Sequence, residues 1–413
     1  HSFPTRRSSD LVNDYLVFAL FFVAIVIGWY LGRRGQAKSA SAPDLPGQYY
    51  KGLNYLLDGK PDGAVDAFIN ALEVNSETLE THIALGNLLR KRGEVDRAIR
   101  IHQNLLARPS LPRAQVHQAH LELARDYISA GLLDRAERLL LDLVAESPIQ
   151  RRDSQLHLLD IYQSEREWQQ AIDIAVELLP RKSLLGGTAG TAADEPGQSV
   201  PVILSHYYCE LAAERRQDND LQGARQLLQE ALAMDKQSVR ASMMLGDVEF
   251  DAGRFKQAIK ALRRVRQQDP LYISESVPSL RACYRELGDE KSLLAYVREC
   301  LDNHPSPPLL LAAAEDIREM DGGSTAEQFL IEQLDKMPSL RGMEKLVSFR
   351  ISASEDKPRE DLNLLQQLVQ RLIEQRPSYR CSHCGFAARQ LHWFCPGCKY
   401  WGTIRPIRGT SME

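Results

Sequence analysis

Apolar side chains recur at three- and four-residue spacings along most of the chain, which is the pattern of helices that bury one face. An alanine occupies the equivalent position in successive blocks, and consecutive alanines of this set are 34, 38, 35, 53 and 34 residues apart. Self-similarity at this period is typical of stacked helical hairpins. These repeat alanines are Ala64, Ala98, Ala136, Ala171, Ala224 and Ala258.

A glycine lies five residues before four of these alanines, where a turn between two helices is expected. Glycine permits the sharp reversal of such a turn, and alanine lets the two helices approach closely. Blocks of this kind resemble the tetratricopeptide repeat, so we predict an all-α tetratricopeptide-repeat solenoid over residues 47–376. The turn glycines are Gly59, Gly93, Gly131 and Gly253.

The 53-residue interval equals one 34-residue repeat and 19 further residues. These extra residues coincide with a segment rich in glycine, alanine and threonine, residues 183–200. Such a composition is typical of a flexible loop, so we predict an insertion between two repeats.

One uncharged run, from Tyr15 to Gly32, interrupts the helical periodicity near the N-terminus. It predicts a single transmembrane helix within residues 12–33, followed by a linker over residues 34–46. The alternatives are a cleaved signal peptide, which lacks a suitable cleavage site here, and a buried helix. Arg33 and Arg34 follow the run directly, so the positive-inside rule places the rest of the chain in the cytoplasm.

Residues 1–11 begin without methionine and read like translated adapter sequence. We interpret them as a non-native leader and leave them out of the fold prediction.

The composition limits the function classes. The chain has 413 residues, a formal net charge of −4 and 44% hydrophobic residues, which excludes global disorder and disfavours a dedicated nucleic-acid binder. No Gly-rich phosphate loop, nucleophile elbow or His-Glu metal helix is found, so we do not expect an enzyme. Among the histidines, His102 is interpreted as structural, and the pair His117 and His120 is only a weak candidate for metal binding.

Four of the seven cysteines lie close to the C-terminus, in two C-x2-C pairs separated by ten residues. This spacing predicts one tetrahedral tetrathiolate site in a small rubredoxin-like or zinc-ribbon module over residues 377–413. The ligands alone do not distinguish iron from zinc, and disulfides are disfavoured in a reducing compartment. The predicted ligands are Cys381, Cys384, Cys395 and Cys398; His383 and His392 lie nearby, and Cys209, Cys283 and Cys300 are interpreted as small buried residues.

A repeat array of this kind presents a concave groove that binds peptides or protein segments. The repeat pattern directs certain side chains of the first helix in each pair toward that groove, with solvated helix positions as the alternative. The candidate partner-binding residues are Asn87, Arg90, Arg125, Asp247 and Phe250.

The C-terminal end is basic, with seven Lys or Arg residues against two Glu from Arg371 onward. Aromatic residues interleave with these charges. Two interpretations of this pattern are a nucleic-acid-binding ribbon and a surface that contacts anionic lipid head groups. The remaining interpretation is that the aromatic side chains form the core of the small module. They are Phe386, Trp393, Phe394, Tyr400 and Trp401.

The order of anchor, repeats and metal knuckle resembles the lipopolysaccharide assembly protein B family. The resemblance rests on GWYLGRR at residues 28–34, GEVDRAIRIHQ at 93–103, HYYCELA at 206–212 and TIRPIRG at 403–409. The leader and the 183–200 insertion depart from the family pattern.

This resemblance implies a single-pass protein of the bacterial inner membrane that faces the cytoplasm. It implies an adaptor that helps a membrane AAA+ protease degrade the lipid A deacetylase, restrained by a lipopolysaccharide-sensing inner-membrane protein, with the metal module held against the repeats. Membrane lipid and a second copy of the chain are further candidate partners, and no nucleic acid is expected. The alternatives are a rubredoxin-like electron-transfer protein and a nucleic-acid-binding ribbon on a repeat scaffold.

Overall fold

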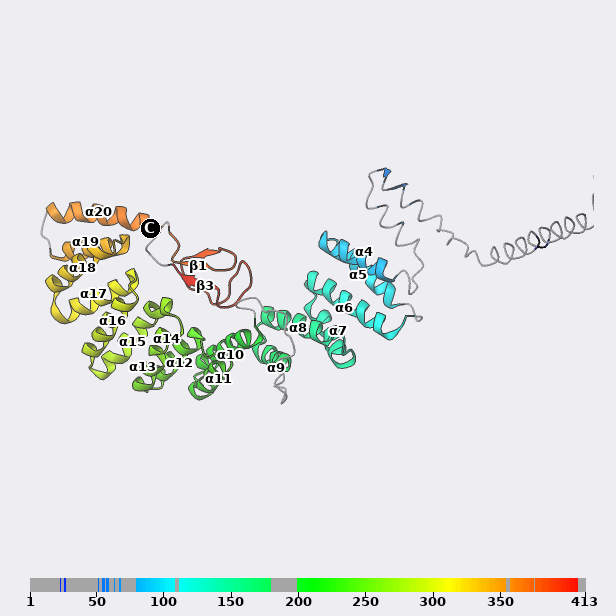
Figure 1. The fold of residues 1–413 in the computed structure, drawn as a ribbon, viewed down its shortest axis with the longest axis horizontal. Helices are drawn as coiled ribbons and strands as arrows, with labels where there is room; N and C mark the ends of the chain where they lie inside the picture. The colour runs from blue at the N-terminus through cyan, green and yellow to red at the C-terminus, as the bar shows by residue number, and fades with distance from the viewer. Residues whose placement is uncertain are drawn as a thin grey trace, which may run out of the picture. The chain divides into compact units, whose positions relative to one another are not determined.

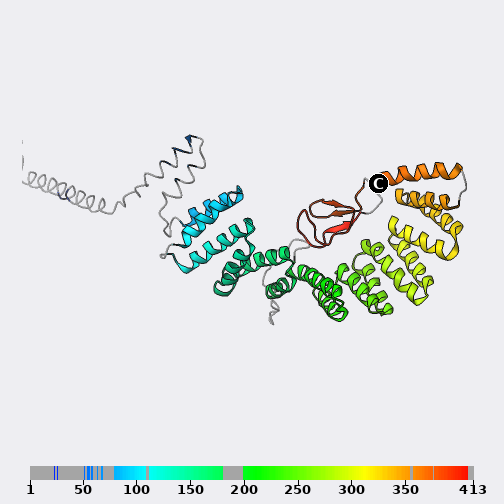
Figure 2. The ribbon, with the colours of Figure 1, turned by 180° about the vertical axis from the view of Figure 1, so that it is seen from behind.

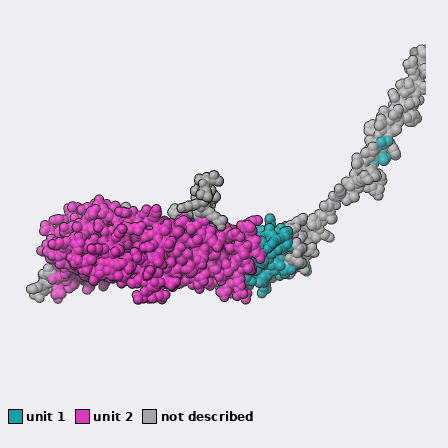
Figure 3. Space-filling model, turned by 90° about the horizontal axis from the view of Figure 1, so that it is seen from below, with its two compact units in different colours: residues 1–131 teal, residues 132–413 magenta. Residues whose placement is uncertain are grey.

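The computed structural model divides the chain into two compact units, residues 1–131 and 132–413 (Figure 3). The described residues are 79–107, 111–179, 199–353, 357–374 and 376–407, with the isolated positions 23, 26, 51, 54, 55, 57, 58, 63 and 67 before them.

Several predicted segments lie outside these residues. They are the leader 1–11, the linker 34–46, the anchor 12–33 apart from Val23 and Val26, and the insertion 183–200 apart from Ser199 and Val200. In the part that is described, no helix combines the length and the apolar character needed to cross a bilayer.

The first unit contains three described helices: α4 (Leu79–Lys91), α5 (Val95–Leu106) and α6 (Arg113–Ser129). Their shared core contains Leu79, Ile83, Leu105 and Ala119. Helix α4 approaches α5 closely at Gly86, since a Cβ there would lie 2.5 Å from the His102 ring. The predicted structural role of His102 is confirmed, because its side chain is fully buried and bonds to Asp126.

The second unit continues the alternation of helices (Figures 1 and 2). The predicted alanines Ala136, Ala171, Ala224 and Ala258 are fully buried, as close packing within a repeat requires. Its helices are α7 (Leu133–Glu146), α8 (Arg151–Glu165), α9 (Trp168–Leu178), α10 (Val200–Gln217), α11 (Leu221–Met234), α12 (Val239–Asp251), α13 (Phe255–Arg263), α14 (Val265–Gln268), the 3-10 helix η1 (Pro270–Tyr272), α15 (Ile273–Leu287), α16 (Glu290–Asn303), α17 (Pro307–Asp321), α18 (Gly323–Lys336), α19 (Leu340–Ala353) and α20 (Lys357–Glu374).

The turns within helical pairs share one backbone conformation. At Gly93 and Gly253 the backbone is left-handed, with φ values of 83° and 69°. The residue after each glycine donates its N–H to the carbonyl oxygen five residues earlier, at 2.9 and 2.8 Å, which is the Schellman ending of a helix. The predicted turn conformation is confirmed there and at Gly131, whose φ is 73°, whereas Gly59 lies outside the described residues.

Two turns adopt the same conformation without glycine. Arg166 and Asn219 have φ values of 60° and 62°, and they lie five residues before Ala171 and Ala224. A left-handed conformation costs an ordinary residue about 1–2 kcal/mol, and asparagine tolerates it better than arginine does. The repeat geometry therefore imposes the turn conformation even where the local sequence does not favour it.

Replacing Arg166 by glycine is expected to raise the free energy of unfolding by about 1 kcal/mol. The Arg166 side chain is exposed, so little contact is lost. Denaturant unfolding followed by circular dichroism measures the change, and Asn219→Gly is the matched variant with a smaller expected gain. An equal or larger gain at Asn219 would contradict the explanation.

The chain ends in a three-stranded antiparallel sheet with strand order β2-β1-β3. Its strands are β1 (Tyr379–Cys381), β2 (Ala387–Ala388) and β3 (Ile404–Pro406). In this register Arg380 lies opposite both Ala387 and Arg405. The module lies against the inner side of the helices of the second unit (Figures 1 and 2). The predicted class, a helical repeat solenoid with a small C-terminal metal-binding module, is confirmed for the described residues.

Candidate metal centre

Each C-x2-C pair forms a knuckle with the same backbone hydrogen bonds. In the first, the N–H of Cys381 donates to the carbonyl of Phe386 at 2.7 Å, and the N–H of Gly385 donates to the carbonyl of Cys381 at 3.1 Å. In the second, the N–H of Cys395 donates to the carbonyl of Tyr400 at 2.9 Å, and the N–H of Lys399 donates to the carbonyl of Cys395 at 2.8 Å.

The residue four positions after the first cysteine is left-handed in both knuckles: φ is 78° at Gly385 and 60° at Lys399. The two pairs are therefore copies of one structural unit that face each other.

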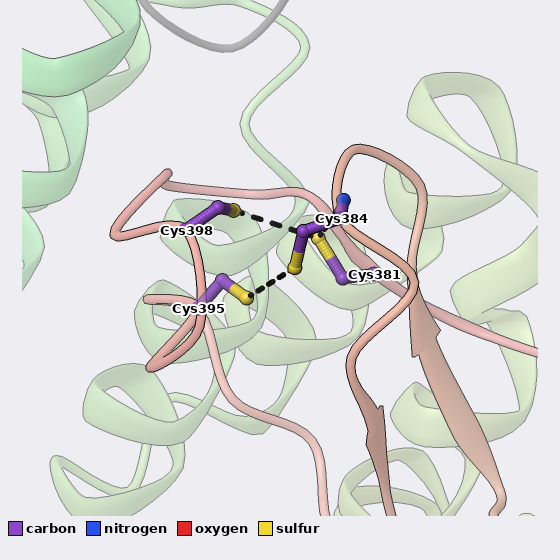
Figure 4. A group of neighbouring side chains, drawn as sticks. All are labelled: Cys381, Cys384, Cys395 and Cys398. Carbon is purple, nitrogen blue, oxygen red and sulfur yellow. Dashed lines mark hydrogen bonds between the residues drawn. The ribbon is translucent and has the colours of Figure 1, made fainter.

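The structure brings the four predicted cysteines together (Figure 4). The Sγ atoms of Cys381 and Cys398 are 3.7 Å apart, as are those of Cys384 and Cys395, and all four atoms lie within 4.8 Å of one another. A tetrahedral ion with metal–sulfur bonds of about 2.3 Å separates its ligands by about 3.8 Å. The sulfur positions thus fit a tetrathiolate ion, and iron and zinc both accept this geometry.

The hydrogen bonds around Cys381 favour its thiolate form. Burial raises the pKa of Cys381, but the backbone N–H of Cys384, the Thr403 hydroxyl and the backbone N–H of His383 outweigh it and lower the pKa to about 6. By contrast, burial and the neighbouring thiols raise the pKa of Cys398 to about 12. A divalent cation would hold all four groups as thiolates, because a coordinating thiol loses its proton.

One side of the centre faces solvent. Cys384 is exposed, whereas Cys381 and Cys395 are buried together with Ile404 in the small core of the module. The His383 ring stacks on Tyr400, with centroids 4.1 Å apart, and the cluster able to hold a metal in the described residues consists of the four cysteines. With four protein ligands the shell is closed, so the ion would serve the structure of the module.

Trp401 fastens the module to the helices. It is 3% exposed, and its indole N–H donates to Oε1 of Gln163 on α8 at 2.8 Å. Its ring stacks on His206 of α10, with centroids 4.9 Å apart and planes 19° apart. The rings of Trp168 and Tyr207 meet it edge-on, at 6.5 and 6.1 Å.

A second group of contacts lies further along the array. Trp393 stacks on Tyr272 at 5.6 Å, and both pack with Val239 and Val265. The Tyr272 hydroxyl donates to the carbonyl oxygen of Ile404 at 2.8 Å.

Polar contacts extend this docking surface to two further helices. The Tyr379 hydroxyl donates to Glu275 of α15 at 2.9 Å, and Arg341 of α19 donates to Ser378 at 2.6 Å. The module therefore bridges helices from α8 to α19. This arrangement weakens the nucleic-acid interpretation, because Trp393 and Trp401 pack on helices and are not free to stack on bases.

Burial holds His206 in its neutral form. Desolvation, with a smaller effect from the Arg240 guanidinium on α12, lowers its pKa from 6.5 to about 3. Gly402 fits closely over the same ring, since a Cβ there would lie 3.3 Å from Nε2. A charged imidazole is thus disfavoured while the module is docked.

Acidification is expected to weaken docking through His206. Its folded pKa lies below its unfolded value, so stability is fully present above about pH 6.5 and is lost as the pH falls toward 3. Between pH 7 and pH 5 the loss is about 2 kcal/mol. Hydrogen exchange of the module as a function of pH measures this, and His206→Gln should remove this part of the pH dependence. If the exchange rates of the module in His206→Gln depend on pH as steeply as in the wild type, His206 is not the group responsible.

The structure places three candidate partner-binding residues of the first unit in a network between α4 and α6. Arg90 donates to Asp126 at 2.7 Å, to Glu122 at 2.8 Å and to Asn87 at 2.7 Å. Arg125 donates to Glu122 at 2.6 Å. These side chains join neighbouring helices, and a role in partner binding stays a prediction.

The other two candidates lie in the second unit. Asp247 accepts a hydrogen bond from Ser279 at 2.9 Å, and burial raises its pKa. Phe250 is partly buried, with its ring 5.4 Å from that of Phe255. Their role in partner binding also stays a prediction. The structure does confirm Cys209, Cys283 and Cys300 as buried free thiols.

Sequence reasoning missed the docking residues of the helices, above all Gln163, His206, Arg240 and Tyr272. Arg240 is only 7% exposed and bonds to Glu210 at 3.0 Å. A signal did exist, because polar residues such as His206 and Arg240 occupy positions that the helical periodicity would bury.

Comparison with sequence families agrees with this architecture. Two matches are described as tetratricopeptide repeat, at residues 81–113 and 215–275. A third, described as a rubredoxin metal binding domain, matches residues 379–406 and so includes all four cysteines.

Two curated relatives are similar over nearly the whole chain, and both are named Lipopolysaccharide assembly protein B. The relative from Escherichia coli (strain K12) is 39% identical over 397 residues, covering 95% of this chain and 98% of its own length. The relative from Haemophilus influenzae is 35% identical over 403 residues, with the same coverage of 95% and 98%. Among solved structures, a crystal structure of MamA is 18% identical and covers 44% of this chain and 93% of its own, with a TM-score of 0.29.

Proposed function

Because the chain belongs to the lipopolysaccharide assembly protein B family, we propose that it is a non-catalytic adaptor in lipopolysaccharide assembly. The observation that carries this proposal is the docked metal module. It packs against helices from α8 to α19, and the cysteine cluster provides four protein ligands for one ion. Such an ion has no open position for a substrate, so its role is to fix the shape of a binding surface.

In this proposal the adaptor controls how fast another protein is degraded. It presents the lipid A deacetylase to a membrane AAA+ protease and thereby limits the supply of lipid A, while a lipopolysaccharide-sensing inner-membrane protein restrains it. These partners come from the family resemblance. The support from this chain is a long repeat array, a class of structure that binds protein segments.

The proposed location is the inner membrane, with the repeats and the metal module on the cytoplasmic side. Its support is the uncharged run from Tyr15 to Gly32 and the two arginines after it. A tether of this kind would raise the effective concentration of the adaptor beside membrane-bound partners.

Reconstitution tests the proposal. The protease and the deacetylase are placed in liposomes with or without the full chain, and the half-life of the deacetylase is measured. The chain is expected to shorten the half-life, and a variant without residues 12–33 is expected to do so less. An unrelated substrate of the protease is the control and should be degraded at the same rate throughout. Equal deacetylase half-lives with and without the chain would refute the adaptor role, and an undiminished effect of the truncated variant would refute the tether.

A further inference from the structure

A cleft lies in the second unit where the C-terminal ends of α15 and α17 meet the first turn of α16, three successive helices (Figure 1). Its volume is about 460 Å³, within the range of about 300–1,000 Å³ that ligand pockets occupy. Among the described residues, its lining comes from these helices and the turn between α15 and α16, not from the metal module. The module contacts α15 at Glu275, and Arg285 lies about 15 Å further along that helix. The docked module therefore leaves the cleft open.

Asp316 of α17 brings an unused hydrogen-bond acceptor to the lining of this cleft. Its side chain is only 6% exposed, and Oδ1 accepts a hydrogen bond from Nε of Arg281 at 2.6 Å. Oδ2 is buried and has no hydrogen-bond partner within the part of the chain that the structure describes. Burial raises the pKa of this carboxyl, and Arg281 opposes that rise. A buried carboxylate oxygen without a donor is costly, so a further N–H donor, above all a cationic one, would stabilise the site.

The charges around the cleft favour a cationic ligand over an anionic one. Four carboxylates and three cations line it, and two of the cations are already engaged. Arg281 is bound by Asp316, and Nη2 of Arg285 donates to Glu319 at 3.1 Å. An anionic ligand would have to displace a carboxylate from an arginine, whereas a cationic ligand adds to the existing pairs. The other charged residues of the lining are Asp289, Glu290 and Lys291.

Glu319 can turn toward a ligand at small cost. The side chains of Arg285 and Glu319 are 59% and 61% exposed, and an ion pair in this setting contributes little to stability. Leu293 and Met320 add apolar surface to the wall of the same cleft. Apolar surface beside carboxylates suits a side chain with an aliphatic stem and a charged head.

We propose that this cleft binds a lysine or arginine side chain of a partner protein. The cationic head lies between the carboxylates of Asp316 and Glu319, and the stem lies against Leu293 and Met320. A partner protein is the source because repeat arrays bind protein segments, and in this respect the proposal rests on the adaptor role. Recognition of the basic side chain itself rests on the cleft alone.

Ligand-observed NMR with short peptides tests the proposal on the full chain in mild detergent. The probes are acetyl-Ala-Arg-Ala-amide and the same peptide with citrulline, a neutral analogue of arginine with nearly the same shape. The arginine peptide is expected to bind with a dissociation constant of about 1 mM, and the citrulline peptide about tenfold more weakly, because it lacks the charge. Equal binding of the two peptides, no binding of the arginine peptide at about 20 mM, or tighter binding of the glutamate analogue would overturn the proposal.

Variants of the chain test the site. Glu319→Gln is expected to weaken binding of the arginine peptide about fivefold and Asp316→Asn to weaken it more, since each removes a carboxylate from the cleft. The fold and metal content of Glu319→Gln should not change, because that side chain is largely exposed. Glu286→Gln is the matched control, because it removes the same charge from an exposed position of α15 outside the lining. An equal loss of binding in Glu319→Gln and Glu286→Gln would mean that only the general surface charge attracts the peptide, and would refute the site.

Spermidine is the last probe, since a small polyamine offers the same cationic chemistry without a protein. A partner protein as the source predicts that spermidine binds no more tightly than the arginine peptide, and tighter binding of spermidine would refute that source. None of these measurements involves the deacetylase. A failed peptide test therefore leaves the adaptor role intact, and a failed reconstitution leaves the recognition of a basic side chain intact.

Discussion

Replacing Cys395 by serine is expected to abolish stoichiometric metal binding and to unfold the C-terminal module. The buried centre of that module consists of Cys381, Cys395 and Ile404, so its apolar core is too small to fold unaided. Structural zinc contributes about 10–16 kcal/mol to the folding of comparable modules, and a serine hydroxyl is a poor ligand for a soft site. The loss should therefore exceed that of any single core substitution in the helices.

Metal analysis and limited proteolysis measure this effect. The wild type should hold one ion for each chain and resist cleavage after residue 376, whereas Cys395→Ser should hold almost none and be cleaved there. Cys300→Ala is the matched control, because its thiol is fully buried in the helical core far from the candidate ligands in sequence. Full metal content and unchanged proteolysis in Cys395→Ser would contradict the proposed centre.

The cysteine cluster could be predicted from sequence because its geometry is local. Two residues between thiols define a knuckle, and the backbone hydrogen bonds that shape it join residues at most five positions apart. The repeat turns are predictable for the same reason, with Gly93 and Gly253 in the expected conformation. Arg166 and Asn219 show the limit of this reasoning, since packing of the two helices imposes the conformation there without a glycine.

The family resemblance implied that the module is held against the repeats, but the residues that dock it could not be predicted from local spacing. Trp401 and Gln163 are separated by 238 positions, and no periodicity links them. The sequence offered three roles for the aromatic residues of the module, and the structure divides them: Phe386 packs in the module core, whereas Trp393 and Trp401 pack on helices. Arg90 shows a similar limit, because the repeat pattern gives its direction but not the carboxylates of α6 that bind it.

Replacing Trp401 by alanine is expected to detach the module while leaving its metal in place. Trp401 is nearly buried and contacts α8, α9 and α10, so its loss should cost docking about 3–5 kcal/mol. The indole lies outside the sulfur cluster, and the knuckle hydrogen bonds involve other side chains and backbone groups. Metal content should therefore stay at the wild-type level, in contrast to Cys395→Ser.

Hydrogen exchange separates the two effects. In Trp401→Ala, amides of the docking surface on α10 and α12 should exchange faster while the knuckle amides remain protected. Trp401→Phe keeps an aromatic ring beside His206 but removes the hydrogen bond to Gln163 and part of the buried ring system, so a smaller loss of about 2 kcal/mol is expected. Loss of metal in Trp401→Ala would mean that docking and metal binding form one cooperative unit. If the metal stays and deacetylase turnover still fails, the docked position of the module, and not the ion alone, is what the proposed adaptor requires.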